Sequence, residues 1–165
     1  MTILALEFSS AQRSVALARD GRVLASAMEA GGYRVTNAFA LIEQVLASAK
    51  VARGDIGVIA VGLGPGSYTG IRAAIAIAQG WQLAAGVKLL GVGSADCLAA
   101  QAQAEKIFGR VNGVIDAQRG EFYLAGWEIS AAACAACCGS FRRRSRVSWF
   151  VSRRRLSRSA CVRTA

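Results

Sequence analysis

A glycine-rich segment, Gly62–Gly70, has the residue types of a loop that could bind an anion. Its sequence, GLGPGSYTG, begins with three glycines and a proline in five positions, which excludes the interior of a helix or strand. The apolar run Val58–Val61 precedes it, and a helical pattern follows over Gly70–Ala84. A helix that begins after such a loop presents unpaired backbone N–H groups to an anion or to another backbone.

The segment does not match the common nucleotide-binding loops. No lysine follows Gly70, so the P-loop pattern fails, and Gly64-x-Gly66 lacks the third glycine of the dinucleotide fingerprint. Ser67 does not stand in a G-x-S-x-G sequence, and the chain has no histidine to act as its base, which excludes a Ser-His-Asp arrangement. The structural alternative is a tight strand-to-helix turn. We predict that at least one of Gly64, Gly66 and Gly70 has a positive φ.

Three carboxylates, those of Glu7, Asp96 and Asp116, could form the metal site of a nuclease. Glu7 ends the first apolar run, where such a site would begin. Asp96 is expected in the first turn of a helix, where the helix dipole favours an acid without any metal. A ribonuclease H-like, metal-dependent nuclease that uses Glu7 and Asp116 is therefore the alternative function. The main interpretation has no catalytic residue and no metal site in this chain.

The last 35 residues differ in composition from the rest. Residues 1–130 carry 11 Lys and Arg against 10 Asp and Glu, whereas residues 131–165 carry nine Arg and no acid. Cysteines between Cys134 and Cys161 have poor spacing for zinc, and the arginines could bind tRNA phosphates. A tail rich in Arg, Ala, Ser and Cys also fits a GC-rich gene read out of frame, which is the interpretation we favour. We expect this tail to be disordered and to stay outside the core.

No segment is expected to enter a membrane or to direct export. The apolar run Ile3–Leu6 is too short for a signal sequence and is followed by Glu7. No window holds 18 uninterrupted apolar residues. Cys97 is the one cysteine in residues 1–130, which fits the reducing cytoplasm. The expected location is cytoplasmic.

The periodicity of apolar residues predicts an α/β fold in which helices flank a mixed sheet. The order β-β-β-α-β-α-β-α-β-β is typical of the ribonuclease H-like and actin-like ATPase superfamily. Strands are expected at Ile3–Phe8, Ser14–Arg19, Arg22–Met28, Val58–Val61, Lys88–Val92, Val111–Asp116 and Phe122–Trp127. The pair Asp20-Gly21 is expected to form the hairpin turn between the second and third of these strands. Helices are expected at Thr36–Lys50 (with Thr36 as N-cap), Gly70–Ala84 and Ser94–Gln103.

Two of these helices carry more apolar surface than one sheet can cover. Some of that surface should remain exposed on the isolated chain, and a contiguous exposed patch marks a protein interface. We expect a partner protein to bind two stripes, formed by Phe39, Ile42 and Leu46 and by Ile71, Ile75 and Ala78.

At the level of motifs the chain resembles the bacterial TsaB (YeaZ) family. The similar stretches cover about residues 1–130, and the glycine segment is the most specific of them. They read ILALEFSS at 3–10, RSVAL at 13–17, AVGLGPGSYTGIRAAIAIAQGWQLA at 60–84, LLGVGSADCLA at 89–99 and VIDAQRGEFYLA at 114–125.

The resemblance implies a non-catalytic scaffold subunit of the machinery that forms threonylcarbamoyladenosine at position 37 of tRNAs reading ANN codons. Such a subunit pairs with a TsaD-like catalytic subunit, a TsaE-like ATPase joins the complex, and tRNA is contacted indirectly. It needs no cofactor of its own, because ATP or ADP and metal belong to the partner subunits. A homodimer is a further possibility. The resemblance also implies that the glycine loop faces a partner or a nucleotide through Gly64, Gly66, Ser67, Thr69, Gly70 and Arg72.

The chain departs from the family pattern at three places. Glu7 and Phe8 stand where the family has Asp and Thr, which would weaken a contact with ATP phosphates. The histidine that the family usually has before its first helix is missing. The resemblance ends at Ser130, so we divide the chain into a TsaB-like lobe, residues 1–130, and the tail, residues 131–165.

Overall fold

The computed structural model describes residues 1–30, 37–118, 121–144 and 161–163. The chain forms two compact units, Met1–Ser94 and Ala95–Ala165, which are described separately. This division falls within the expected lobe of residues 1–130, because residues after Ser94 build a second sheet with its own apolar cluster. Within the described residues no helix combines the length and apolar character needed to cross a membrane.

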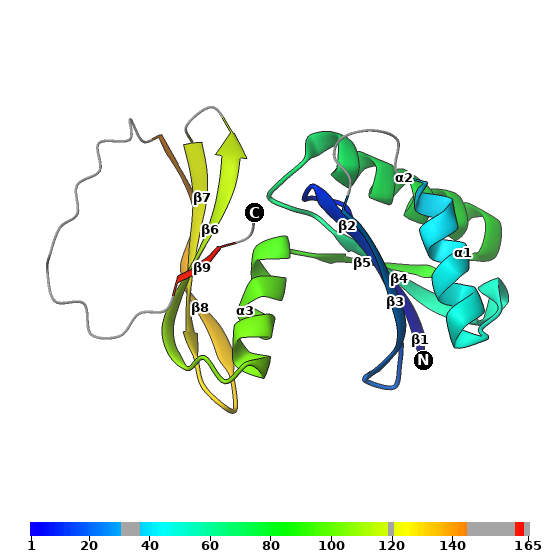
Figure 1. Ribbon diagram of the computed structural model, residues 1–165, viewed down its shortest axis with the longest axis horizontal. Helices are drawn as coiled ribbons and strands as arrows, with labels where there is room; N and C mark the ends of the chain where they lie inside the picture. Colours follow the sequence, from blue (N-terminus) through cyan, green and yellow to red (C-terminus); the bar gives the residue numbers. More distant parts are fainter. Residues whose placement is uncertain (31–36, 119–120, 145–160, 164–165) are drawn as a thin grey trace, which may run out of the picture. The chain divides into compact units, whose positions relative to one another are not determined.

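The first unit is built on a five-stranded sheet with the order β3-β2-β1-β4-β5 (Figure 1). Strands β1 (Thr2–Glu7), β2 (Gln12–Arg19) and β3 (Arg22–Ala30) form an antiparallel meander. Strands β4 (Ile56–Gly62) and β5 (Lys88–Val92) run parallel to β1. The carboxyl ends of β1, β4 and β5 therefore meet at one edge of the sheet.

The turn between β2 and β3 is the predicted Asp20-Gly21 hairpin. Both residues have positive φ, 50° at Asp20 and 77° at Gly21, as a two-residue turn between right-twisted strands requires. The N-terminal ammonium group of Met1 donates a hydrogen bond to Asp20 Oδ1 at 2.5 Å, and this contact lowers the pKa of the Asp20 carboxyl. Both groups are exposed, so the ion pair adds little to stability.

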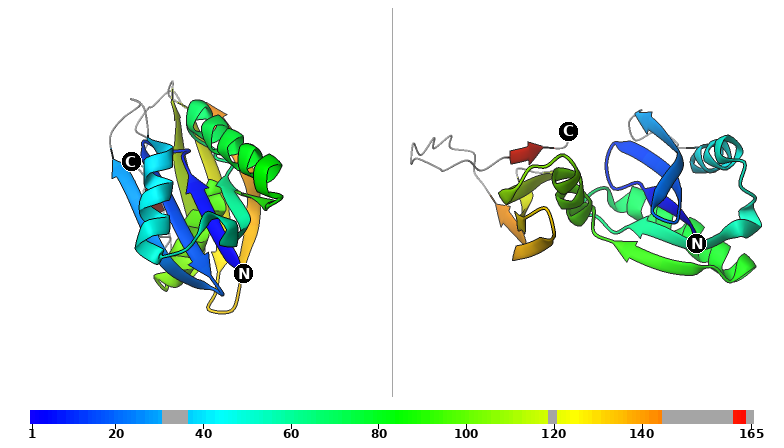
Figure 2. Two further views of the ribbon diagram at one scale, coloured as in Figure 1. Left: turned by 90° about the vertical axis from the view of Figure 1, so that its right-hand side faces the viewer. Right: turned by 90° about the horizontal axis from the view of Figure 1, so that it is seen from below.

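Two helices cover one face of this sheet, α1 (Ala38–Ala49) and α2 (Tyr68–Ala85) (Figures 1 and 2). Alternate residues of the central strands, such as Leu4 and Leu6, point into the core beneath these helices. The core-facing stripe of α1 is large and that of α2 is small. These stripes consist of Ala38, Leu41, Ile42, Val45 and Leu46 in α1, and of Gly70, Ala74 and Ala78 in α2.

The N-cap of α1 is Asn37, not Thr36 as predicted. Asn37 Oδ1 accepts a hydrogen bond from the backbone N–H of Ala40 at 3.2 Å, which satisfies one of the unpaired donors of the first turn. Thr36 lies outside the described residues. The helix ends at Lys50, whose φ of 54° is the left-handed cap conformation.

Asn37→Ala is expected to lower the free energy of unfolding by about 1 kcal/mol, because the Ala40 N–H loses its acceptor. Asn37→Ser is the matched control, since a serine oxygen also caps helices well. Urea denaturation of both variants checks this. Equal losses for Ala and Ser would show that the cap hydrogen bond is not what Asn37 contributes.

The second unit holds a four-stranded sheet with the order β8-β7-β6-β9. Helix α3 spans Ser94–Ala104, and its small residues Ala99 and Ala102 pack against this sheet. Its strands are β6 (Gly109–Gln118), β7 (Glu121–Ile129), β8 (Cys134–Arg144) and β9 (Cys161–Arg163). Val111, Ala125, Trp127 and Ile129 complete its apolar cluster.

The expectation of a disordered tail is wrong for the backbone of β8 and β9. Strand β8 pairs antiparallel with β7, and β9 pairs parallel with β6. Ladder hydrogen bonds join backbone groups, so an open strand edge can pair with a segment of almost any composition. The side chains of residues 131–135 are exposed, residues 145–160 lie outside the described part of the chain, and the out-of-frame origin of the tail stays a prediction.

Candidate functional sites

The glycine loop connects β4 to α2 by a backbone path that needs glycine. Gly64 has φ +82°, in the left-handed region that side chains rarely adopt, which confirms the predicted special conformation. Gly66 and Gly70 are required by close approach instead. A Cβ atom at Gly66 would lie 2.1 Å from the carbonyl oxygen of Ser9, and one at Gly70 would lie 1.9 Å from that of Phe8.

The loop therefore packs on the backbone that follows β1. The Ser67 N–H donates a hydrogen bond to the Ser9 carbonyl at 2.5 Å, and the Ser67 hydroxyl caps α2 by accepting from the Gly70 N–H at 3.3 Å. These contacts support the structural interpretation of Gly66, Ser67 and Gly70, namely a tight strand-to-helix turn.

Two of the predicted loop residues point outward. Thr69 and Arg72 are exposed, and the guanidinium group of Arg72 lies 5.2 Å from the centre of the Tyr68 ring. Tyr68 itself is 73% exposed. This cation–π pair holds a positive charge beside an aromatic ring at the start of α2, a composition that is common in protein interfaces.

The carboxylates proposed for a nuclease lie in different surroundings. Both oxygens of Glu7 accept hydrogen bonds from neutral donors, Oε1 from the Ser9 N–H at 2.7 Å and Oε2 from the Ser94 hydroxyl at 2.9 Å. Asp96 lies in the first turn of α3, as predicted, and Asp116 lies in β6. Across the described residues no three His, Cys, Asp or Glu side chains gather to hold a metal. Nothing here favours the nuclease alternative.

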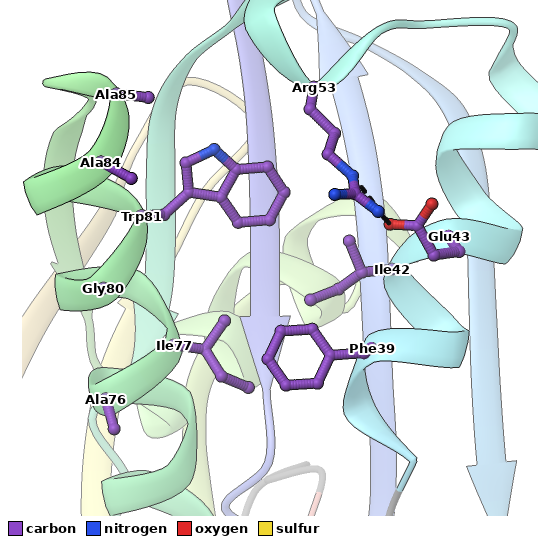
Figure 3. A pocket seen from close by; sticks show the side chains of 10 residues that line it. All are labelled: Phe39, Ile42, Glu43, Arg53, Ala76, Ile77, Gly80, Trp81, Ala84 and Ala85. Carbon is purple, nitrogen blue, oxygen red and sulfur yellow. Dashed lines mark hydrogen bonds and ion pairs between the residues drawn. The ribbon is translucent and has the colours of Figure 1, made fainter.

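An apolar groove of about 590 Å³ runs between α1 and α2 on the outside of the helical layer (Figure 3). Ile77 and Trp81 project from α2 toward Phe39 and Ile42 of α1. Arg53 lies at one end, in the short 3₁₀ helix Arg53–Asp55. The lining residues are Phe39, Ile42, Glu43, Arg53, Ala76, Ile77, Gly80, Trp81, Ala84 and Ala85.

An ion pair closes the Arg53 end of the groove. Arg53 donates from Nη2 and Nε to Glu43 Oε1, at 2.7 and 3.0 Å, as Figure 3 shows. Both side chains are more than half exposed, so the pair adds little to stability. It does place a polar rim beside an apolar lining, the usual arrangement at a protein interface.

The structure separates the six residues predicted for partner binding into core and surface. Ile42, Leu46 and Ala78 belong to the core, at 1%, 5% and 0% exposure; this corrects the assignment of Leu46 and Ala78, which do not line the groove. Ile71 and Ile75 are partly buried, and Ile75 packs against the core. Phe39 is 64% exposed. Phe39 and Ile42 line the groove.

The predicted stripes did not include the α2 side of the groove. Ala76, Gly80 and Ala84 recur every four residues and form a row of small residues, beside which Ile77 and Trp81 stand one turn apart. Residues spaced by four share one face of a helix. That row was a usable signal, but the choice of which apolar face meets the sheet depended on the packing of Ala74 and Ala78.

The chain matches the family model "TsaD: tRNA N6-adenosine threonylcarbamoyltransferase" over residues 30–143. It is 34% identical over 128 residues to the Escherichia coli (strain K12) tRNA threonylcarbamoyladenosine biosynthesis protein TsaB, which covers 78% of this chain and 55% of that protein. The chain thus spans about half the length of the curated relatives it matches.

Solved structures agree with the sequence matches. YeaZ from Pseudomonas aeruginosa superposes with a TM-score of 0.78 at 30% identity, covering 92% of this chain and 72% of that one. The (R)-2-hydroxyglutaryl-CoA dehydratase component A of Acidaminococcus fermentans, at 11% identity, a TM-score of 0.52 and coverage of 87% of this chain and 48% of that one, shows a likeness of fold alone. The fold is a lobe of the actin-like ATPase type, as the element order predicted. By both sequence and structure the chain belongs to the TsaB (YeaZ) family of tRNA threonylcarbamoyladenosine biosynthesis proteins.

Proposed function

We propose that this chain is a non-catalytic scaffold subunit in the formation of threonylcarbamoyladenosine at position 37 of tRNAs reading ANN codons. Its groove between α1 and α2 would bind a TsaD-like catalytic subunit. The observation that carries the proposal is the exposed apolar lining of the groove, with Phe39 and Trp81 on opposite walls, in a member of the TsaB family.

The likeness between this chain and the TsaD family model supports a TsaD-like subunit as the protein that occupies the groove. That model matches residues 30–143, a range that contains α1 and α2. A TsaD-like subunit would therefore present a comparable pair of helices. Two similar surfaces can pack about a pseudo-twofold axis, each helix pair seated on the other, as in an isologous dimer. A second copy of this chain could use the same surface, which makes a homodimer the competing outcome.

The rest of the proposal is what membership of the TsaB family implies. The chain would hold no cofactor of its own, and metal and ATP or ADP would belong to the partner subunits. A TsaE-like ATPase would join the assembly, tRNA would be contacted indirectly, and the complex would work in the cytoplasm. Thr69 and Arg72 are exposed near the start of α2 and would be available to these partners.

The test is to titrate the purified chain into a TsaD-like subunit by isothermal calorimetry and to measure the mass of the mixture by light scattering. A one-to-one complex with micromolar or tighter affinity supports the proposal. A mixture in which the chain forms only a homodimer, or a titration that shows no heat of binding at about 100 μM, would contradict the proposal. Micromolar affinity corresponds to a binding free energy of about −8 kcal/mol.

A further inference from the structure

We propose that Glu7 and the packed glycine loop close the carboxyl-edge crevice of this chain to nucleotide phosphates. In open α/β sheets, ligands bind outside the carboxyl ends of parallel strands, and the actin-like ATPase fold implies a nucleotide near the ends of β1 and β4. The residues present do not fit one. This inference is independent of partner binding, because none of its residues lines the groove between α1 and α2.

The Glu7 side chain already occupies the space beside the end of β4. Leu6 pairs with Val61 in the parallel ladder, so Glu7 stands next to Gly62 on the same face of the sheet. A Cβ atom at Gly62 would lie 2.1 Å from Glu7 Oε2. The carboxylate therefore lies directly over the Gly62 backbone, where it would repel a phosphate.

A closed circuit of hydrogen bonds holds the carboxylate in place. The Ser9 N–H donates to Oε1 at 2.7 Å, and the Ser94 hydroxyl donates to Oε2 at 2.9 Å. The Ser9 and Ser94 hydroxyl oxygens lie 3.0 Å apart; because Ser94 gives its proton to Glu7, Ser9 donates to Ser94. The Ser9 N–H and the Ser94 hydroxyl are thus engaged by the chain's own carboxylate and are not available to an external anion.

The chain's own backbone also fills the space beside Gly66 and Gly70 in the loop. Gly66 and Gly70, which an anion would approach most closely, lie against the carbonyl oxygens of Ser9 and Phe8. The Ser67 N–H is bonded to the Ser9 carbonyl. Carbonyl oxygens carry partial negative charge, so this side of the loop is unfavourable for a phosphate as well as filled.

The first test uses the wild-type chain and MgADP, followed by ¹H–¹⁵N spectra of the backbone amides. We expect the amide signals of Gly62, Gly64, Gly66 and Gly70 to stay unchanged up to millimolar MgADP. Saturable shifts of these four signals would overturn the proposal. This measurement requires no variant, so it decides the question even if a substitution prevents folding.

The second test removes the internal anion and offers a small one in its place. Glu7→Ala is expected to lower Tm by about 4–8 °C, because Ser9 and Ser94 lose their acceptor. Sodium formate should then raise the Tm of Glu7→Ala more than sodium chloride of equal ionic strength does. Glu43→Ala, which removes an exposed carboxylate paired with Arg53, is the control and should not respond to formate.

Each outcome of the second test bears on the proposal. Recovery of Tm by formate in Glu7→Ala but not in Glu43→Ala supports the proposal that the Glu7 carboxylate fills this anion position. A wild-type Tm for Glu7→Ala, or equal responses of both variants to formate, contradicts it. Binding of MgADP to Glu7→Ala at the loop amides would show that the packing of Gly66 and Gly70 does not exclude phosphates.

Discussion

Gly70→Ala is expected to lower the free energy of unfolding by about 3 kcal/mol or more, whereas Gly80→Ala in the same helix is expected to raise it by about 0.5–1 kcal/mol. The two substitutions add the same methyl group to α2. They differ in what that group meets: the Phe8 carbonyl oxygen at 1.9 Å from the Gly70 Cβ position, and open space at Gly80.

The physical reason for the opposite signs lies in how α2 is attached to the sheet. The first turn of α2 lies directly on the backbone after β1, and neither element can yield without disturbing the Ser67–Ser9 hydrogen bond. At Gly80, alanine only reduces the entropy of the unfolded chain and improves helix propensity. Both substitutions are measured by urea denaturation.

A loss of stability at both sites would contradict the expected gain at Gly80, because an added methyl group would then destabilise α2 even where it meets open space. A neutral Gly70→Ala would contradict the close approach of α2 to Phe8, and with it the structural account of the glycine loop. Because a clash of this kind changes the native state, the urea midpoint should fall while the m-value stays close to that of the wild type.

Ala76→Glu is expected to weaken binding of a TsaD-like partner at least about 100-fold while leaving the fold intact. Ala76 is exposed and lines the groove at the end away from Arg53 (Figure 3). The nearest other cation, Arg72, stands one turn earlier in α2, outside the groove lining, and its guanidinium group lies over the Tyr68 ring, so the groove lining itself offers the new carboxylate no cation. An unpaired charge buried by a partner costs about 3 kcal/mol or more, and 1.4 kcal/mol corresponds to a factor of ten in Kd.

Ala73→Glu is the matched control for this experiment. Ala73 is exposed on the same helix but does not line the groove, so the same charge there should leave Kd within about threefold of the wild-type value. Ile75 is a poorer choice than Ala76, because its side chain packs partly against the core. A charge at Ile75 would confuse loss of folding with loss of binding.

The sequence was sufficient to predict most of the strands and helices, but it predicted one mixed sheet where the structure has two. Apolar periodicity located the strands and helices from Thr2 to Ile129, and the Asp20-Gly21 pair located the first hairpin. These features are local, so they follow from residue spacing and turn chemistry. Strands β8 and β9 were missed because their pairing depends on the open edges of β7 and β6, which no local pattern in the tail reveals.

The candidate site was harder to predict because it depends on which face of each helix meets the sheet. In α1 the face that meets the sheet includes Leu41 and Val45. Ile42 and Leu46 share this face and are buried with them, whereas Phe39 stays exposed. In α2 the small residues Ala74 and Ala78 face the sheet. Apolar character alone assigned Ala78, together with Ile71 and Ile75, to the partner-binding stripe.

The most direct test of the account is to compare the Kd values of Ala76→Glu and Ala73→Glu for a TsaD-like subunit by isothermal calorimetry. Circular dichroism first checks that both variants have the wild-type spectrum and Tm. A loss of affinity of at least about 100-fold for Ala76→Glu, with near wild-type affinity for Ala73→Glu, is the predicted result. Equal affinities for the two folded variants would contradict the assignment of the groove between α1 and α2 as the partner site.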